Sequence, residues 1–401
     1  MSPRVSKRAA SVAVSATLEV LRAAAALRAR GVDVVDLGPG EPDFPTPEYI
    51  KEAGIAAIRA NLTKYTDALG IPELRHAIAD GYRKAWNSPW ELGNVVVTTG
   101  GKQALHTACL ALFEEGDDVL IPRPYWVSFP EMVKLAGARP VFVPTAPDDG
   151  FRLTASLVEN AATPSTRGVI VNSPNNPTGA VTIRREIEGI VRLAARNGWL
   201  VLFDECYDRL VFDGDPFSAA AFAREFTETV LVCGSLSKSH AMTGWRLGFA
   251  LGPAELTAAM GRIVSHATSS VCSIAQRAAL AALASPDESK AAVEGMLREY
   301  AKRREFLIPA LNALPGVSCS RPGGALYAFP DLSFHFGRTL GSFELTGSSA
   351  LAKALLEVAA VAVTPGVAFG EDRCIRISFA NSMERLEEGI ARIRKALGEI
   401  R

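Results

Sequence analysis

Six short apolar runs between residues 94 and 233 constrain the fold of this chain more than any other feature. Each run has the length and composition of a buried strand, and most are followed by a segment with helical periodicity. The runs cover residues 94–98, 118–121, 139–143, 168–172, 199–203 and 229–233. This alternation predicts an α/β fold with a mostly parallel sheet and helices on both of its faces.

The remaining sequence predicts a second, smaller α+β domain. Residues 290–312 have the pattern of one long charged helix that links two bodies. Beyond it, strand-like runs alternate with helical segments, at 325–329, 348–359, 361–363, 374–379 and 383–400. A helix predicted at 17–30 is expected to fold back onto this part. We therefore expect a large domain at 48–292 and a small domain made of 1–47 and 293–401.

Composition excludes several classes of function. Lys and Arg total 43 and Asp and Glu total 43, so no net charge favours nucleic acid or an anionic membrane as a partner. The six cysteines form no CxxC pair, and the five histidines form no cluster with metal-ligand spacing. This usage predicts a reducing, cytoplasmic environment and no metal site. No apolar run approaches the roughly 18 residues needed for a spanning helix.

Candidate functional residues follow the predicted strands. Ligands of parallel sheets bind beyond the carboxyl ends of the strands, and five residues follow strands there: Gly101, Trp126, Asn176, Asp204 and Lys238. Each has a plain structural explanation by itself, such as a tight turn, a core tryptophan, a surface acid or a solvated lysine. Their convergence at one edge of the sheet favours a binding site instead.

The residue types at this edge match the needs of pyridoxal phosphate. A lysine on a turn at the end of a strand, here Lys238, can serve as a Schiff-base nucleophile. The strand–glycine–helix turn at Gly101, with Arg246, can hold a phosphate. A buried carboxylate such as Asp204 can keep the pyridine nitrogen protonated. A phenol such as Tyr207, with an amide, can bind the ring oxygen, and an indole can stack on the ring.

Eight segments then identify a resemblance. They are similar to those of class I aminotransferases of fold type I, and within that class to bacterial aspartate aminotransferases of the thermophile and plant-prephenate branch. They occur in the family's order at 40–44, 64–75, 100–105, 124–128, 172–179, 204–207, 235–246 and 376–378. The resemblance implies a fold type I pyridoxal-phosphate-dependent transferase. Such an enzyme has a large domain with a mostly parallel seven-stranded sheet and a smaller α+β domain.

The same resemblance implies individual roles. Lys238 would bind the cofactor covalently and shuttle a proton between substrate Cα and cofactor C4′. Asp204 would pair with the pyridine nitrogen, and Tyr207 would contact the ring oxygen. The other implied cofactor contacts are Gly101, Lys102, Trp126, Asn176, Ser235, Arg246 and, from a second subunit, Tyr65. Arg376 would bind the substrate α-carboxylate, and the rest of the implied substrate site is Gly40, Lys102, Trp126 and Asn176.

The implied reaction moves an amino group between an amino acid, expected to be aspartate or glutamate, and a 2-oxo acid such as 2-oxoglutarate. It follows a ping-pong route in which the cofactor alternates between its pyridoxal and pyridoxamine forms. The implied assembly is a homodimer with shared active sites. An aromatic or broad-range aminotransferase stays open, as does a specialised enzyme that uses the cofactor for elimination, cyclisation or oxidation. A non-catalytic regulator would need an added DNA-binding domain, for which the chain shows no spare length.

Two departures from the family pattern bear on specificity. Cys206 stands where the family usually has isoleucine or a similar residue. Relatives that accept dicarboxylic substrates often carry a lysine a few residues before the segment that matches Ser15-Ala16-Thr17. Residues 11–14 of this chain are Ser-Val-Ala-Val and contain no base. Lys102, which the resemblance makes a partner of a distal carboxylate, is retained, and the expectation of an acidic donor depends on it.

Overall fold

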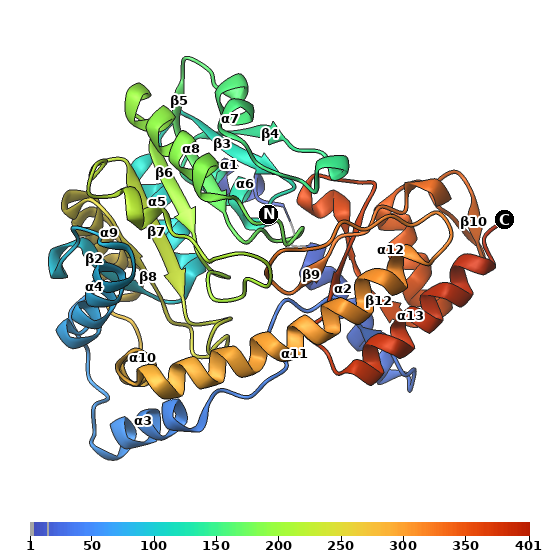
Figure 1. The fold of residues 1–401 in the computed structure, drawn as a ribbon, viewed down its shortest axis with the longest axis horizontal. Helices are drawn as coiled ribbons and strands as arrows, with labels where there is room; N and C mark the ends of the chain where they lie inside the picture. The colour runs from blue at the N-terminus through green and yellow to red at the C-terminus, as the bar shows by residue number, and fades with distance from the viewer. Residues whose placement is uncertain (1–3, 14–15) are drawn as a thin grey trace.

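The computed structural model describes residues 4–13 and 16–401, and a seven-stranded sheet forms its centre (Figure 1). The strand order is β2-β8-β7-β6-β5-β3-β4. All six predicted runs are strands of this sheet, and the seventh strand is β8, which runs antiparallel to both of its neighbours. The strands are β2 (Val95–Thr98), β3 (Asp118–Arg123), β4 (Arg139–Pro144), β5 (Thr166–Asn172), β6 (Leu200–Asp204), β7 (Val230–Ser235) and β8 (Gly248–Leu251).

Helices cover both faces of this sheet because successive strand side chains point to opposite sides. Along β6, for example, Val201 and Phe203 belong to one apolar cluster and Leu202 to another. The first cluster lies under α3 (Glu48–Arg59), α4 (Pro72–Trp86), α7 (Ala155–Ala161), α8 (Arg184–Asn197) and α10 (Ser273–Ala284). The second lies under α5 (Gly101–Leu112), α6 (Ser128–Leu135) and α9 (Ala254–Thr268).

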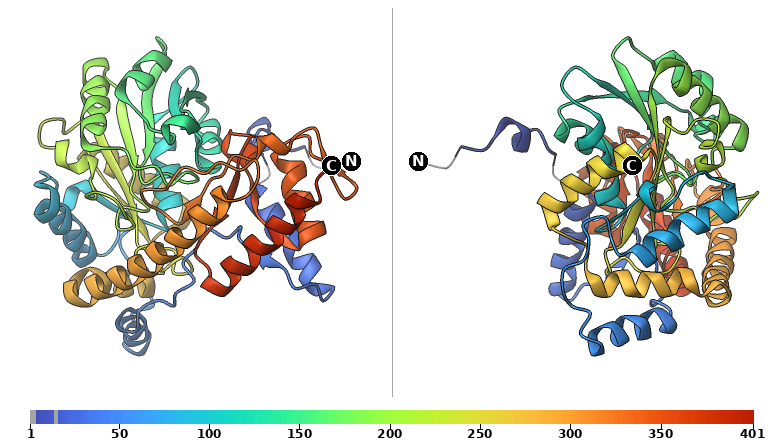
Figure 2. Two further views of the ribbon diagram at one scale, coloured as in Figure 1. Left: turned by 45° about the vertical axis from the view of Figure 1, so that its right-hand side comes forward. Right: turned by 90° about the vertical axis from the view of Figure 1, so that its left-hand side faces the viewer.

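A second body is built on a three-stranded sheet of order β13-β14-β9. Its elements are β9 (Tyr327–Ala328), α12 (Ser348–Ala359), β12 (Val361–Ala362), β13 (Thr364–Pro365), β14 (Ile375–Ser378) and α13 (Met383–Gly398). The N-terminal helix α2 (Ala16–Ala29) packs against this body (Figure 2), where Ala24 and Leu27 cluster with Leu356 and Ala362. Strand β1 (Val35–Asp36) pairs with β12. The prediction that the N-terminal helix folds back is therefore confirmed.

Helix α11 (Pro286–Asn312) links the two bodies (Figure 1). Its second half packs into the apolar core of the smaller body through Tyr300 and Leu307. Two arginines fix it at the junction, because Arg303 pairs with Asp43 at 2.7 Å and Arg304 donates to the carbonyl of Pro322 at 2.9 Å. The predicted division between residues 292 and 293 falls inside this helix and stays a prediction.

One local prediction was wrong. The pair Thr46-Pro47 predicts a helix that begins at Pro47 with Thr46 as its N-cap. Pro47 instead occupies the cap position, and no side chain caps α3. The Thr46 hydroxyl instead donates to the carbonyl of Ala241 at 2.6 Å and accepts from the indole nitrogen of Trp245 at 3.0 Å. The hydroxyl therefore binds two residues that lie far along the chain instead of capping the helix. These bonds connect the segment before α3 to the loop that carries Lys238.

Within residues 4–13 and 16–401, no helix has the length and apolar character that crossing a membrane requires. In the same residues, His, Cys, Asp and Glu side chains form no group of three that could hold a metal ion.

Candidate active site

A cavity of about 410 Å³ lies where β5, β6 and β7 end, between the large sheet and the strands β9 and β14. Eleven of the twelve predicted site residues line it: Gly40, Gly101, Lys102, Trp126, Asn176, Asp204, Tyr207, Ser235, Lys238, Arg246 and Arg376. Its size lies in the range of small-molecule sites. The exception, Tyr65, lies elsewhere with 87% of its surface exposed.

The floor of the cavity is formed by adjacent strand ends. Asp204 is the last residue of β6 and pairs in register with Asn172 of β5 and Cys233 of β7. Its side chain is buried, and its carboxylate accepts a hydrogen bond of 3.0 Å from the backbone N–H of Cys206. Burial raises the pKa of Asp204 to about 7. A buried carboxylate is stabilised by a cation or a strong N–H donor, so this position fits a protonated ring nitrogen.

Besides Arg376, three basic side chains line the same cavity, Lys102, Lys238 and Arg246. The Lys238 ammonium donates to the carbonyl of Gly40, and the Lys102 ammonium lies 4.9 Å from the ring centroid of Trp126. Burial lowers the pKa of Lys102, and the charges of Arg246 and Lys238 lower it further. Mutual repulsion among these groups would be relieved by an anion, and a phosphate suits such a cluster.

The start of α5 provides a cradle for that anion. Gly100 has φ +82°, and a Cβ at this position would lie 2.5 Å from an Arg246 guanidinium nitrogen. A Cβ at Gly248 of β8 would collide with the backbone nitrogen of Gly101. Glycines at both positions therefore allow strand β8, the Arg246 guanidinium and the start of α5 to lie close together. The first backbone N–H groups of a helix have no partner within it, so they bind anions well.

Arg376 of β14 forms the opposite wall. It is 3% exposed, and it donates to the Asn176 side-chain oxygen at 3.0 Å and to the carbonyl of Gly38 at 2.7 Å. Its Nε has no hydrogen-bond partner among the described residues. The partners found for this buried guanidinium are neutral, and a substrate carboxylate would supply the missing negative charge.

A pair of phenols completes the site. The hydroxyls of Tyr207 and Tyr327 are 2.7 Å apart, and burial raises the pKa of Tyr207 well above its usual value. The sequence predicted a strand that includes Tyr327 but gave no sign that its side chain enters the cavity. The other lining residues without a predicted role include Asn172, Cys206 and Ser237. The sequence did offer a signal for Ser237, since it lies between Ser235 and Lys238 in the same loop. In the structure its hydroxyl is 2.7 Å from that of Ser235.

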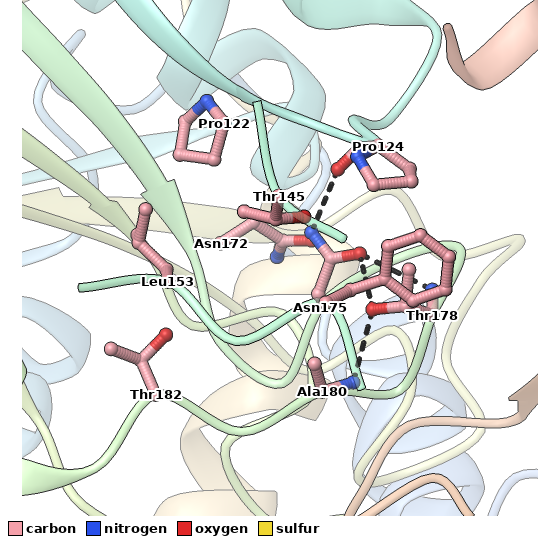
Figure 3. A pocket seen from close by; sticks show the side chains of 10 residues that line it. Pro122, Pro124, Thr145, Leu153, Asn172, Asn175, Thr178, Ala180 and Thr182 are labelled. Carbon is pink, nitrogen blue, oxygen red and sulfur yellow. Dashed lines mark hydrogen bonds between the residues drawn. The ribbon is translucent and has the colours of Figure 1, made fainter. Parts of the chain in front are cut away.

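Side chains that line a smaller neighbouring cavity hold the loop after β5 in place (Figure 3). Asn175 points into that cavity, where its side-chain oxygen accepts bonds from Thr178 and its amide nitrogen donates to the carbonyl of Pro124 at 3.4 Å. Asn176, the next residue, points into the main cavity. Asn175 therefore fixes the loop, and Asn176 faces the main cavity.

The N-terminal segment lies beside α6, which begins two residues after Trp126. The N–H of Ala13 donates to Glu131 at 3.0 Å, and Lys134 donates to the carbonyl of Ser11 at 3.1 Å. Val14, the last residue of the region 11–14 that contains no base, lies outside the described residues, as does Ser15.

Comparisons with known proteins identify the family of the chain. The family model "Aminotransferase class I and II" matches residues 32–393. The aspartate/prephenate aminotransferase of Cereibacter sphaeroides is 44% identical, with 96% of each chain covered. The aspartate aminotransferase of Bacillus sp. is 39% identical over 98% of this chain and 99% of its own length.

Solved structures give the same picture. The Thermus thermophilus aspartate aminotransferase with maleate has a TM-score of 0.93 at 40% identity, and the match covers 98% of this chain and 100% of that one. The aspartate aminotransferase of Rhizobium meliloti has a TM-score of 0.94 at 37% identity, with 100% of both chains covered. The fold is that of a fold type I transferase. The chain belongs to the class I and II aminotransferases.

The buried carboxylate predicts a pH-dependent stability. Asp204 titrates near pH 7 when folded and near its ordinary 3.8 when unfolded, so the folded protein binds more protons between these values and loses stability as the pH rises. A tenfold difference between the two proton affinities corresponds to about 1.4 kcal/mol. Asp204→Asn should therefore raise the Tm of the cofactor-free protein at pH 8 and leave it nearly unchanged at pH 4. Equal Tm values for the two proteins at pH 8 would contradict the burial argument.

Proposed function

We propose that this aminotransferase uses pyridoxal 5′-phosphate, with aspartate or glutamate as donor and a 2-oxo acid such as 2-oxoglutarate as acceptor. The observation that carries the proposal is the cavity that Lys238, Asp204 and Arg376 share. Bound there, pyridoxal phosphate supplies an electron-withdrawing ring and holds the amino group between the two halves of a ping-pong reaction.

The residues of this chain have separate tasks in the proposed reaction. Lys238, once released, is the base that takes and returns the proton at the substrate Cα. Asp204 holds a proton on the ring nitrogen, and Tyr207 and Asn176 donate to the ring oxygen. Arg376 binds the substrate α-carboxylate, and Gly40 helps to position it. Trp126 stacks on the ring, and the phosphate lies against Gly101, Lys102, Ser235 and Arg246.

We further propose a homodimer in which Tyr65 completes the partner's phosphate site. Tyr65 is exposed, yet its loop is well held, since Thr66 accepts from the Gln276 side chain at 2.9 Å and its N–H donates to Ser270 at 3.4 Å. A rigid loop that presents an exposed tyrosine suits a contact between subunits. All six cysteines are free thiols, which supports the proposed cytoplasmic location.

A second specificity is favoured by the N-terminal segment. Residues 11–14 carry no base, so the donor and acceptor range can include neutral or aromatic compounds. The Cereibacter sphaeroides relative is named for prephenate as well as aspartate. On the ground of that name alone, prephenate, a dicarboxylate, is the second acceptor to test, beside neutral and aromatic compounds.

The first prediction from this function concerns Lys238. Aspartate should convert the bound pyridoxal form completely to the pyridoxamine form, and 2-oxoglutarate should reverse the change, as followed by absorbance. Lys238→Ala should abolish turnover and the borohydride-stable link between cofactor and protein. Lys134→Ala, which changes a lysine outside the cavity, should retain both. A stable link at another lysine would disprove the assignment.

The second prediction concerns Lys102. A carboxylate that enters a desolvated pocket needs a cation, and the Lys102 side chain reaches past the phosphate cradle towards Trp126. Lys102→Ala should lower kcat/KM for aspartate about tenfold more than kcat/KM for phenylalanine, as expected for loss of one charge-assisted hydrogen bond. If both donors fall by the same factor, Lys102 serves only the phosphate. A wild-type enzyme inert towards both aspartate and glutamate would contradict the donor assignment.

The third prediction concerns the shared site. Tyr65→Phe and Lys238→Ala should each impair the homodimer, while a mixture of the two after subunit exchange should regain activity, because one site of each hybrid holds both native residues. Sedimentation should show a dimer. A fully active monomer, or mixtures that never exceed the sum of the parents, would refute the assembly.

A further inference from the structure

Tyr327 occupies a position that joins the two sheets. It lies on β9, opposite Ser378 of β14, and is 1% exposed. Its hydroxyl is 2.7 Å from that of Tyr207, which follows β6 of the large sheet, and the two rings meet edge to face with centroids 5.8 Å apart. The phenol pair is therefore a direct hydrogen bond between the two bodies of the protein.

The same side chain also contacts the carboxylate-binding wall. The Arg376 guanidinium lies over the Tyr327 ring, with its carbon 4.4 Å from the centroid. A Cβ at position 40 would collide with the Tyr327 hydroxyl, so only glycine fits where the backbone carbonyl accepts from Lys238. Tyr327 thus touches the proposed ring-oxygen donor, the proposed substrate clamp and the backbone beside the lysine.

The number of hydroxyl protons decides which phenol donates the hydrogen bond between Tyr207 and Tyr327. Each phenol has one proton to donate, and its oxygen can also accept. When Tyr207 donates to an acceptor in the cavity, the bond between the two hydroxyls has to be donated by Tyr327. Hydrogen bonds in such a chain polarise one another, so Tyr207 becomes a stronger donor. Arg376 and Cys206 are the other titratable groups that act on this phenol.

We propose that Tyr327 is a positioning residue with two separable roles. Its hydroxyl donates to Tyr207 and strengthens the bond from Tyr207 to the cofactor ring oxygen, while its ring face supports the Arg376 guanidinium that binds the substrate carboxylate. The inference rests on the proposed function and deepens it. It also explains why a tyrosine, which supplies both a ring and a hydroxyl, occupies this point of β9.

The hydroxyl role is tested by a double-mutant cycle on the pH titration of the absorbance of the Lys238-linked cofactor. A donor to the ring oxygen favours the deprotonated link, so Tyr327→Phe should raise the pKa of the link by about 0.5 to 1, as expected for loss of one hydrogen bond. The change should vanish when Tyr207→Phe is already present. Tyr300→Phe, which removes another buried phenol hydroxyl away from the cavity, should leave the pKa unchanged.

The ring role is tested by a different substitution. Tyr327→Leu removes the face under Arg376 and should raise KM for aspartate about 2–30-fold, the range for a lost cation–π contact. Tyr327→Phe keeps that face and should leave KM within about twofold of the parent. The Tm of each cofactor-free variant reports folding. If Tyr327→Leu does not fold, an unchanged KM in Tyr327→Phe together with its raised pKa still supports the separation of the two roles.

Three results would overturn the inference. These are a Tyr327→Phe pKa equal to that of the parent, a pKa change of the same size with and without Tyr207, and equal changes of KM in the Phe and Leu variants. Failure of the wild-type protein to take up pyridoxal phosphate would instead overturn the proposed function. The two failures are therefore distinguishable from the first absorbance spectrum.

Discussion

The buried carboxylate of Asp204 is the constraint on which the rest of the site depends. It ends a central strand, its in-register neighbours Asn172 and Cys233 are buried, and its side chain receives a hydrogen bond from the N–H of Cys206. Folding therefore places a group with a pKa of about 7 where its charged form is poorly solvated. A ligand with an N–H cation would stabilise the charged form of this carboxylate. The basic groups of Lys102, Lys238 and Arg246 lie together in the same cavity, and an anion bound there would reduce the repulsion between them.

One ligand with a cationic ring nitrogen and an anionic phosphate meets both needs only if the two subsites are fixed relative to each other. The central sheet supplies that rigidity. Asp204 and Lys238 follow adjacent parallel strands, and the antiparallel β8 brings Gly248 against the start of α5. The second body then closes the cavity through contacts that cross between the sheets, Tyr327 with Tyr207 and Arg376 with Asn176. The proposed cofactor pocket and the proposed substrate-binding arginine are therefore positioned by two different apolar cores.

Sequence patterns predicted the elements well and some of their contacts poorly. All six runs became strands. The runs inside the sheet are nearly continuous in apolar residues because they are buried on both faces, and that signal is local. The edge strand β4 is largely exposed, and only Val143 of it is fully buried. Thr46 was mistaken for a helix cap because a hydroxyl before a helix usually has that role, whereas here Ala241 and Trp245 bind it. The antiparallel direction of β8 was equally hidden, since a short apolar run carries no mark of its orientation.

The sequence by itself determined the alternation of strands and helices, the chemistry at the strand ends and the membership of the aminotransferase family. Those features are written in residue types and short spacings. The tertiary structure alone decided that the side chain of Tyr327 enters the cavity and that its hydroxyl meets that of Tyr207. It also decided that Arg376 donates to the carbonyl of Gly38, which lies 338 residues away along the chain. Burial and long-range contacts arise from how two separate cores pack together, and no local pattern records that packing.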